Sequence, residues 1–180
     1  MDEFQRRVRL EALFHAHAGA VRAYARRRIG AAGADDTVSE VFAIAWRRLD
    51  DVPDEALPWL LGCARRVLAH QYRRARRDSA LVDRLEQFAS VSAAAVGWAG
   101  DDDVLARAFA ELSDRDREIL LLIAWEGLDT RQAAAVLGCS RNTLAVRFHC
   151  ARRRLAAALD RVETHQSFTT PPHAAKEAPR

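Results

Sequence analysis

The sequence predicts an all-α protein made of two small helical domains joined by a linker. Apolar residues recur with a helical period on either side of residues 78–100, and no stretch alternates with the period of two typical of half-buried strands. Within 78–100 the composition changes to Ala, Ser, Gly and Val with little charge, as in a tether. We therefore expect domains at 1–77 and 101–163, a partly helical linker between them, and a disordered tail at 164–180.

The first domain is predicted to contain three helices. Residues 4–29 keep a helical period, as one long helix or two in series, until Gly30–Gly33 breaks it. An amphipathic helix follows, with acids at its start, where they favour the positive end of the helix dipole. A loop at 50–54 leads to a third helix that follows Pro58 and ends in a run of arginines. The apolar stripe of the second helix comprises Val38, Val41, Phe42, Ala45, Trp46 and Leu49.

Two predicted helices open the second domain. The first runs from Asp101 through Leu112, and Ser113 then caps the second. The apolar period of the second helix continues as far as Gly127. Both helices lie in an acidic stretch, because residues 101–130 hold nine acids and three arginines.

A helix-turn-helix is predicted next, at residues 128–155. Asp129 and Gln132 form a capping box at its start, and Gly138 can take the left-handed conformation that ends its first helix. Ser140 caps the second helix, whose opposite face is free to enter a DNA major groove. The buried stripe of this second helix comprises Leu144, Phe148, Ala151 and Leu155.

Basic residues gather in two places along the chain. Lys176 is the only lysine among 28 basic residues, and arginine suits phosphate and guanine recognition, although GC-rich coding explains its abundance equally well. Residues 65–77 hold six arginines and no acid, and residues 131–161 hold seven arginines against Asp160 alone. Two separate basic patches in a chain of net charge +3 indicate two contacts with a polyanion.

Several classes of protein are disfavoured. No apolar run approaches the ~20 residues of a membrane span, and arginines interrupt the N-terminal segment where a signal peptide would be apolar. Cys63, Cys139 and Cys150 form no CxxC and no Cys/His ligand spacing, which indicates reduced, packed thiols. No glycine-rich phosphate loop, metal-ligand cluster or nucleophile–base pair is visible. We expect a cytoplasmic protein with no membrane association, cofactor, metal or catalytic activity.

Three stretches carry a resemblance to a known family: ADDTVSEVFAIAWR at 34–47, PWLLGCARR at 58–66, and LSDRDREILLL at 112–122 followed by the helix-turn-helix. Together, in this order, they resemble the extracytoplasmic-function sigma factors of the sigma-70 family. The resemblance covers roughly 8–77 and 103–159. It implies a non-catalytic adaptor that directs bacterial core RNA polymerase to promoter DNA.

In the first domain the resemblance implies two sites. The exposed edge of the 34–47 helix would dock on the clamp helices of the polymerase, although an ordinary capped surface helix is the alternative. The docking residues would be Asp35, Asp36, Ser39 and Glu40. The 50–58 loop and the 59–77 helix would capture the non-template strand of the minus-ten element. Its phosphate or base contacts would be Arg65, Arg66, His70, Arg73 and Arg74.

In the second domain the resemblance implies a site for the minus-thirty-five element. Ser140 and the first-turn amides of the recognition helix would fix a phosphate. The reading or clamping residues would be Arg141, Asn142, Val146, His149 and Arg153, with Arg147 and Arg152 at the phosphate rims. Val146 can touch a thymine methyl but offers no hydrogen-bond donor, so we expect partly shape-dependent readout. His149 is either a phosphate ligand or a surface residue.

Two other functions remain open from the sequence. A stand-alone helix-turn-helix regulator would use its first domain to dimerise or sense a signal, and would bind a palindromic operator without polymerase. An enzyme or ligand-binding domain fused to a DNA reader would need a constellation that the sequence lacks. An anti-sigma factor is a further candidate partner that the sequence neither indicates nor excludes. The opposed charges also suggest that the acidic cluster at 101–103 holds the two domains together in the free protein.

Overall fold

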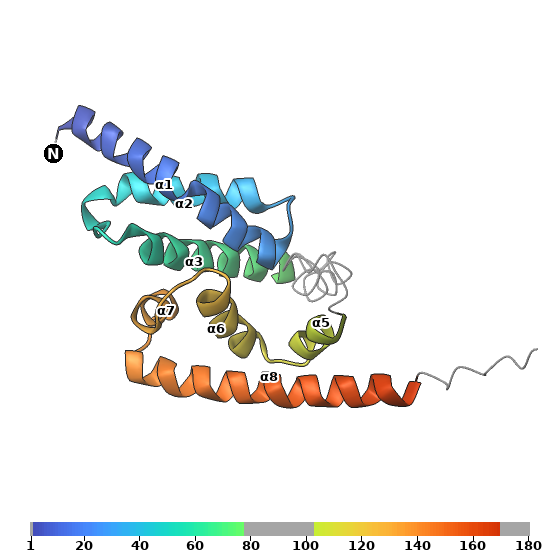
Figure 1. Cartoon of the computed structure of the whole chain (residues 1–180). Coiled ribbons are helices and arrows are strands. Elements are labelled where there is room, and N and C mark those ends of the chain that lie inside the picture. The colour runs from blue at the N-terminus through green and yellow to red at the C-terminus, as the bar shows by residue number, and fades with distance from the viewer. Residues whose placement is uncertain (1, 78–102, 170–180) are drawn as a thin grey trace, which may run out of the picture.

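The structure, a computed structural model, describes residues 2–77 and 103–169 (Figure 1). These ranges form α-helices, one short 3₁₀ helix and turns, and they contain no strand. The predicted all-α fold is therefore confirmed for this part of the chain. The predicted linker, with its helical segment, and the end of the predicted tail lie outside the described residues.

The first domain consists of α1 (Glu3–Ile29), α2 (Ala34–Arg47) and α3 (Ala56–Arg77), with a 3₁₀ helix, η1, at Leu49–Asp51. Of the two alternatives for the first segment, the single long helix is correct. It starts at a capping box between Asp2 and Gln5 and ends at Gly30, whose φ is 77°. The three helices pack on one another around the predicted stripe of α2.

Two boundaries in this domain differ from the predictions. Leu49 belongs to η1 rather than to the end of the α2 helix, and η1 occupies part of the predicted loop. Leu49 is nevertheless fully buried. The apolar period therefore predicted its burial correctly, although it did not predict its secondary structure. Helix α3 begins at Ala56, ahead of Pro58, because proline fits the first turn of a helix, where its missing N–H is not needed.

The second domain consists of α5 (Asp103–Ala110), α6 (Asp114–Ala124), α7 (Thr130–Leu137) and α8 (Arg141–Thr169). The predicted caps are present: Ser113 Oγ accepts a hydrogen bond from the Asp116 amide at 3.2 Å, and Asp129 and Gln132 form the capping box of α7. Gly138 is left-handed at the end of α7, with φ 66° and ψ 40°. The helix-turn-helix prediction is confirmed in its details.

Helix α8 continues past the predicted tail boundary at 163 and ends at Thr169. Ala158 and Val162, before that boundary, extend the buried stripe of α8 and form a small apolar cluster with Ala108 of α5. The remainder of the predicted tail, residues 170–180, lies outside the described residues.

The two domains pack against each other through α3 and α7 (Figure 1). A single apolar cluster joins residues of the first domain, such as Leu61, to residues of the second, such as Ile119 and Val136. Gly62 of α3 lies beneath α7, where an added Cβ would sit 3.9 Å from the Val136 Cα. The largest apolar cluster of the described residues therefore spans both predicted domains.

The left-handed Gly138 gives a direct stability prediction. Gly138→Ala should lower the free energy of unfolding by about 1 kcal/mol, because a Cβ disfavours the left-handed conformation. Gly19→Ala is the matched control: Gly19 lies inside α1 with no atom within 4 Å of the added Cβ. That substitution should raise stability by roughly 0.5–1 kcal/mol. Urea unfolding followed by circular dichroism measures both, and equal effects of the same sign would contradict the assignment.

Candidate nucleic-acid and polymerase interfaces

The first half of α8 presents one exposed face made of predicted reading residues. Leu144 and Ala151 are buried against the domain, and Phe148 is half-buried between them. The opposite face is exposed, and Val146 at its centre is 66% exposed. The structure therefore brings four predicted reading residues together on one side of the helix: Asn142, Val146, His149 and Arg153. The fifth, Arg141, is exposed in the first turn, but its spacing of three and seven residues from Leu144 and Phe148 places it along the other side of the helix.

The start of α8 is fixed by Ser140. Its Oγ accepts a hydrogen bond from the Thr143 amide at 3.1 Å and lies 2.8 Å from Thr143 Oγ1. This is the predicted N-cap, which leaves the helix with an ordered, positively polarised N-terminus that suits a phosphate. Among the predicted rim residues, Arg147 is half-buried, whereas Arg152 is exposed with its guanidinium 5.8 Å from the Phe148 ring centroid.

One arginine of this helix has a structural role instead. Arg154 Nη1 donates to both carboxylate oxygens of Asp116, at 2.8 and 3.0 Å, and Asp116 is buried at the start of α6. The same carboxylate accepts from Ser113 Oγ at 2.8 Å. This pairing ties α8 to α6 and sets the orientation of the recognition face.

The basic face of α3 is exposed along its length, with His70, Arg73 and Arg74 open to solvent. Arg66 is also exposed, but its Nε donates to the Gly62 carbonyl at 3.1 Å. It lines a cavity of about 490 Å³ together with Trp59 of α3 and with residues of α7. The other α7 residues and loop residues that line this cavity are Arg131, Gln132, Ala135, Pro53 and Glu55.

Arg65 faces a second cavity, of about 350 Å³, that also lies between the domains. Tyr24 and Arg28 of α1 line this cavity, as do Asp114 and Glu118 of α6. Both arginines that begin the predicted minus-ten contacts are therefore next to the interdomain contact, whereas those later in α3 are not among the residues that line the two cavities.

The four predicted docking residues, Asp35, Asp36, Ser39 and Glu40, all lie exposed on the first turns of α2. Asp35 forms an exposed ion pair with Arg22 Nε of α1 at 2.6 Å. Phe42, which the sequence places in the core, is buried, and its ring centroid lies 4.9 Å from that of Phe14. Trp46 is only half-buried, with the Arg6 guanidinium 5.3 Å from its ring centroid.

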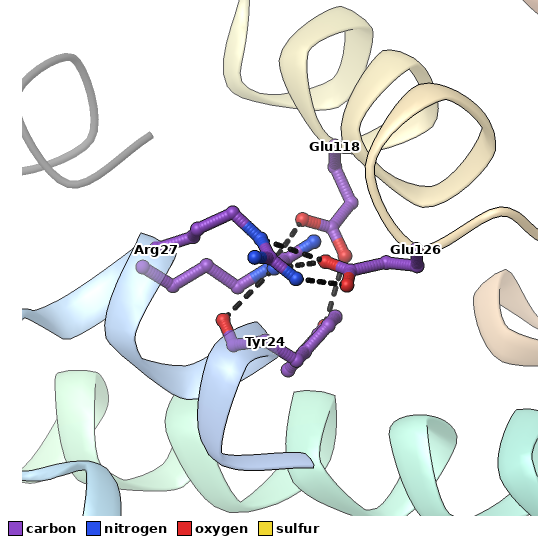
Figure 2. A network of polar contacts seen from close by, with 5 residues as sticks. Tyr24, Arg27, Glu118 and Glu126 are labelled. Atoms are coloured by element: carbon purple, nitrogen blue, oxygen red, sulfur yellow. Dashed lines mark hydrogen bonds and ion pairs between the residues drawn. The ribbon is translucent and has the colours of Figure 1, made fainter. Parts of the chain in front are cut away.

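A polar network that the sequence analysis missed joins α1 to the second domain (Figure 2). Arg28 Nε pairs with Glu118 Oε2 at 2.8 Å, and Arg28 Nη1 pairs with Glu126 Oε1 at 3.1 Å. Arg27 pairs with Glu126 through its Nε and Nη2, and the Tyr24 hydroxyl donates to Glu118 Oε1 at 2.9 Å. We call these five residues the interdomain network.

The side chains of the interdomain network are largely shielded from solvent. The Glu126 side chain is only 4% exposed and that of Arg28 is 12% exposed. Burial raises the pKa of the Tyr24 phenol, which is therefore a neutral donor. Burial alone would lower the pKa of Arg28, but the Glu118 carboxylate and the other neighbours outweigh that effect and raise it. The charges of the network are thus compensated by one another rather than by water.

A signal for the network existed in the charge pattern. The last turn of α1 contains Arg26, Arg27 and Arg28, and residues 101–130 are strongly acidic. The side chains of the acidic cluster at 101–103, for which a closing role was predicted, lie outside the described residues. Within the described residues, the acids that pair with α1 across the domains are Glu118 and Glu126.

Metal and membrane sites are not found in the described part of the chain. Within residues 2–77 and 103–169, no group of three or more His, Cys, Asp or Glu side chains could hold a metal ion. No helix in the same ranges is long and apolar enough to cross a membrane. The three cysteines are free thiols: Cys63 is buried, and Cys139 and Cys150 are half-buried.

The comparisons with known proteins agree with this arrangement. Residues 13–78 match the family Sigma-70 region 2, and residues 102–155 match the family Sigma-70, region 4. The ECF RNA polymerase sigma factor SigL of Mycobacterium tuberculosis is 32% identical over 157 residues, covering 83% of this chain and 88% of its own. This chain belongs to the extracytoplasmic-function sigma factors of the sigma-70 family.

Other relatives of this sigma factor include CnrH of Cupriavidus metallidurans, which is 32% identical over 139 residues and covers 70% of this chain and 73% of its own. The structure of CnrH with the cytosolic domain of CnrY superimposes with a TM-score of 0.58 at 28% identity, covering 84% of this chain and 87% of that one. RpoE of Bartonella quintana, solved with the anti-sigma factor NepR, shares the fold with a TM-score of 0.61 at 24% identity, covering 83% and 96% of the two chains.

The function follows from the family. The chain is an RNA polymerase sigma factor, which directs core enzyme to promoter DNA for the initiation of transcription. Because region 2 and region 4 both match, the stand-alone regulator and the enzyme fused to a DNA reader are not favoured.

The buried thiol gives a chemical prediction. Burial raises the pKa of Cys63 more than the nearby Arg66 lowers it, and the thiolate is the reactive form of cysteine. Cys63 should therefore react with iodoacetamide more slowly than Cys139 and Cys150, as measured by mass spectrometry of the labelled peptides. Because the folded state keeps this proton longer than the unfolded state, stability should fall as the pH rises past the pKa of the unfolded thiol. Labelling of Cys63 as fast as the other two would show that α3 is not packed as described.

Proposed function

We propose that the three surfaces divide the work of a sigma factor. The exposed edge of α2 docks on core polymerase, the basic face of α3 holds the non-template strand of the minus-ten element, and the exposed face of α8 reads the minus-thirty-five element. The chain contributes no catalytic group of its own and acts in the cytoplasm, where the polymerase supplies the chemistry.

The observation that carries the proposal is the exposed face of α8. Asn142, Val146, His149 and Arg153 share one side of a helix whose other side is buried in the domain, as a helix that enters a major groove requires. Arg153 supplies a cation on this face, and Arg141 supplies an exposed cation in the first turn of the helix. Val146 between them offers an apolar surface to a thymine methyl.

The basic face of α3 supports the second part of the proposal. Arg66, His70 and Arg73 follow one another at helical spacing on the exposed side, so that a single strand can run along them. Single-strand grooves combine such cations with aromatic rings that stack on bases. Trp59 lines the cavity beside Arg66 and is the aromatic ring in the right place.

The acidic edge of α2 supports the third part. Its polar side chains are exposed while the neighbouring Val38, Val41 and Phe42 are buried, so the edge is free to meet a basic partner surface. Exposed charges of this kind steer association and set partner choice more than they set affinity.

An anti-sigma protein is a further partner that we propose for this chain. The solved structure of CnrH, which is 28% identical to this chain, contains CnrH in complex with the cytosolic domain of CnrY. The similar fold of this chain gives such a protein two domains to contact.

The proposal is tested by reconstitution with bacterial core polymerase. We expect the protein to co-elute with core enzyme and to open one set of promoter fragments but not a shuffled control. Specific duplex binding by the free protein, with no association with core enzyme, would contradict it.

The role of α8 gives a mutational prediction. Arg141→Ala combined with Arg153→Ala should weaken promoter binding by roughly tenfold or more, because each good contact to a base or phosphate contributes about 1–3 kcal/mol. The same variant should still co-elute with core polymerase. Arg161→Ala is the control, since Arg161 pairs with Glu111 farther along α8. Unchanged promoter binding in filter or anisotropy assays would remove α8 from its assigned role.

The proposed docking role of α2 gives a second mutational prediction. Asp36→Lys combined with Glu40→Lys should weaken association with core polymerase by about tenfold, because like charges across an interface repel. Glu11→Lys, an exposed charge reversal on α1, should have little effect. Fluorescence titration of core enzyme measures both, and an equal loss in the two variants would indicate a non-specific charge effect.

A further inference from the structure

We propose that the exposed face of α8 selects A·T base pairs in the minus-thirty-five element through two uncharged contacts. The amide of Asn142 binds an adenine, and the side chain of Val146 packs on the C5-methyl group of a thymine. This inference rests on the proposed role of α8 and adds the class of sequence that it reads. It also makes the C5-methyl a recognised group, so that 5-methylcytosine is distinguished from cytosine at the same position.

The first argument is the placement of the arginines along α8. Arg154 is held by the buried Asp116. The Arg152 guanidinium lies 5.8 Å from the Phe148 ring centroid, and Arg147 is half-buried. At these positions they flank the exposed face, where cations meet phosphates rather than base edges. The first two turns of this face therefore present no arginine, which is the residue that most often reads guanine.

The second argument is the exposure of Val146. Its side chain is 66% exposed, and among the large hydrophobic side chains of the described residues only Phe4 is more exposed. Its neighbour Ala145 is exposed as well, whereas Leu144 is fully buried. These apolar side chains offer a base edge no hydrogen bond, but removing a thymine methyl from water against them is favourable. The centre of the face therefore suits a methyl group in the major groove.

The third argument is the place of Asn142. It is exposed one helical turn before Val146, next to the N-cap at which Ser140 Oγ accepts from the Thr143 amide at 3.1 Å. An asparagine amide can donate to adenine N7 while it accepts from the adenine N6 amino group. Four residues of helix rise about 6 Å, close to two steps of about 3.4 Å along B-DNA. An adenine and a thymine about two base pairs apart can therefore be contacted together.

Selection with the assembled holoenzyme identifies the sequence that is read. The full chain is combined with bacterial core polymerase, and promoter duplexes randomised over the minus-thirty-five element are selected by binding. We expect enrichment of an adenine and a thymine about two base pairs apart. A selected element without A·T pairs, or no enrichment by a holoenzyme that assembles, would overturn the proposal. Failure of the proposed function itself is distinguishable, because the chain would then not co-elute with core polymerase.

Base analogues in the selected duplex test the methyl contact. Deoxyuridine in place of the thymine removes only the C5-methyl and should weaken binding by about fourfold, as expected for one small apolar group returned to water. With cytosine at this position, 5-methylcytosine should bind more tightly than cytosine by the same factor of about four. In Val146→Ala both differences should largely disappear.

A second analogue tests the amide contact. 7-Deazaadenine lacks the N7 acceptor and should weaken binding of the wild type by about fivefold, but should have little effect in Asn142→Ala. Arg161→Ala is the matched control, because Arg161 pairs with Glu111 away from the exposed face, and it should respond to every analogue as the wild type does. Each comparison is made within one variant, so a general loss of affinity does not mimic the expected pattern.

The analogue experiments would overturn the proposal in either of two ways. One is a wild type that binds the thymine and deoxyuridine duplexes equally. The other is an analogue effect of the same size in the wild type, in Val146→Ala and in Asn142→Ala, which would mean that other side chains contact the methyl group and N7.

Discussion

The structure depends on one compensated set of charges between α1 and the second domain. Arg27 and Arg28 at the end of α1 meet Glu118 and Glu126 in a nearly dry environment, where losing one partner would cost about 3–5 kcal/mol. That is a large share of the roughly 5–15 kcal/mol by which a domain is stable. A buried pair adds little net stability against separated, hydrated charges. The network therefore determines how the domains are arranged more than whether they fold.

The helix-turn-helix contributes both to the interdomain contact and to the exposed recognition face. One side of α7 packs on α3, and α8 lies beyond it (Figure 1). The reading face of α8 is exposed. The apolar cluster runs through Leu61 of the first domain and Ile119 and Leu144 of the second, so separating the domains exposes part of a shared core. Arg154 and Asp116 keep α8 in place on α6 independently of this contact. A change in the interdomain contact can therefore leave the recognition helix intact.

Local features were predictable from the sequence because they depend on neighbouring residues. The capping box at Asp129, the left-handed Gly138 and the stripe of α2 each follow from a spacing of a few residues, and the structure has all of them. The predicted reading face of α8 is exposed for the same reason. Long-range pairings were not predictable: Arg154 reads as one more free cation, and the ion-pair partners of Arg28 lie 90 and 98 residues away. Periodicity shows which face is buried, but not what buries it.

In the described structure the two domains of the free sigma factor are in contact, and we expect them to separate on core polymerase. The most direct test of this expectation is the distance between spin labels at two exposed positions, Ala12 of α1 and Ala156 of α8, measured by double electron–electron resonance in a variant without the native cysteines. The account predicts a single narrow distance distribution in the free protein and a different, longer one in complex with core polymerase. A broad distribution in the free protein, or the same distance in both states, would contradict it.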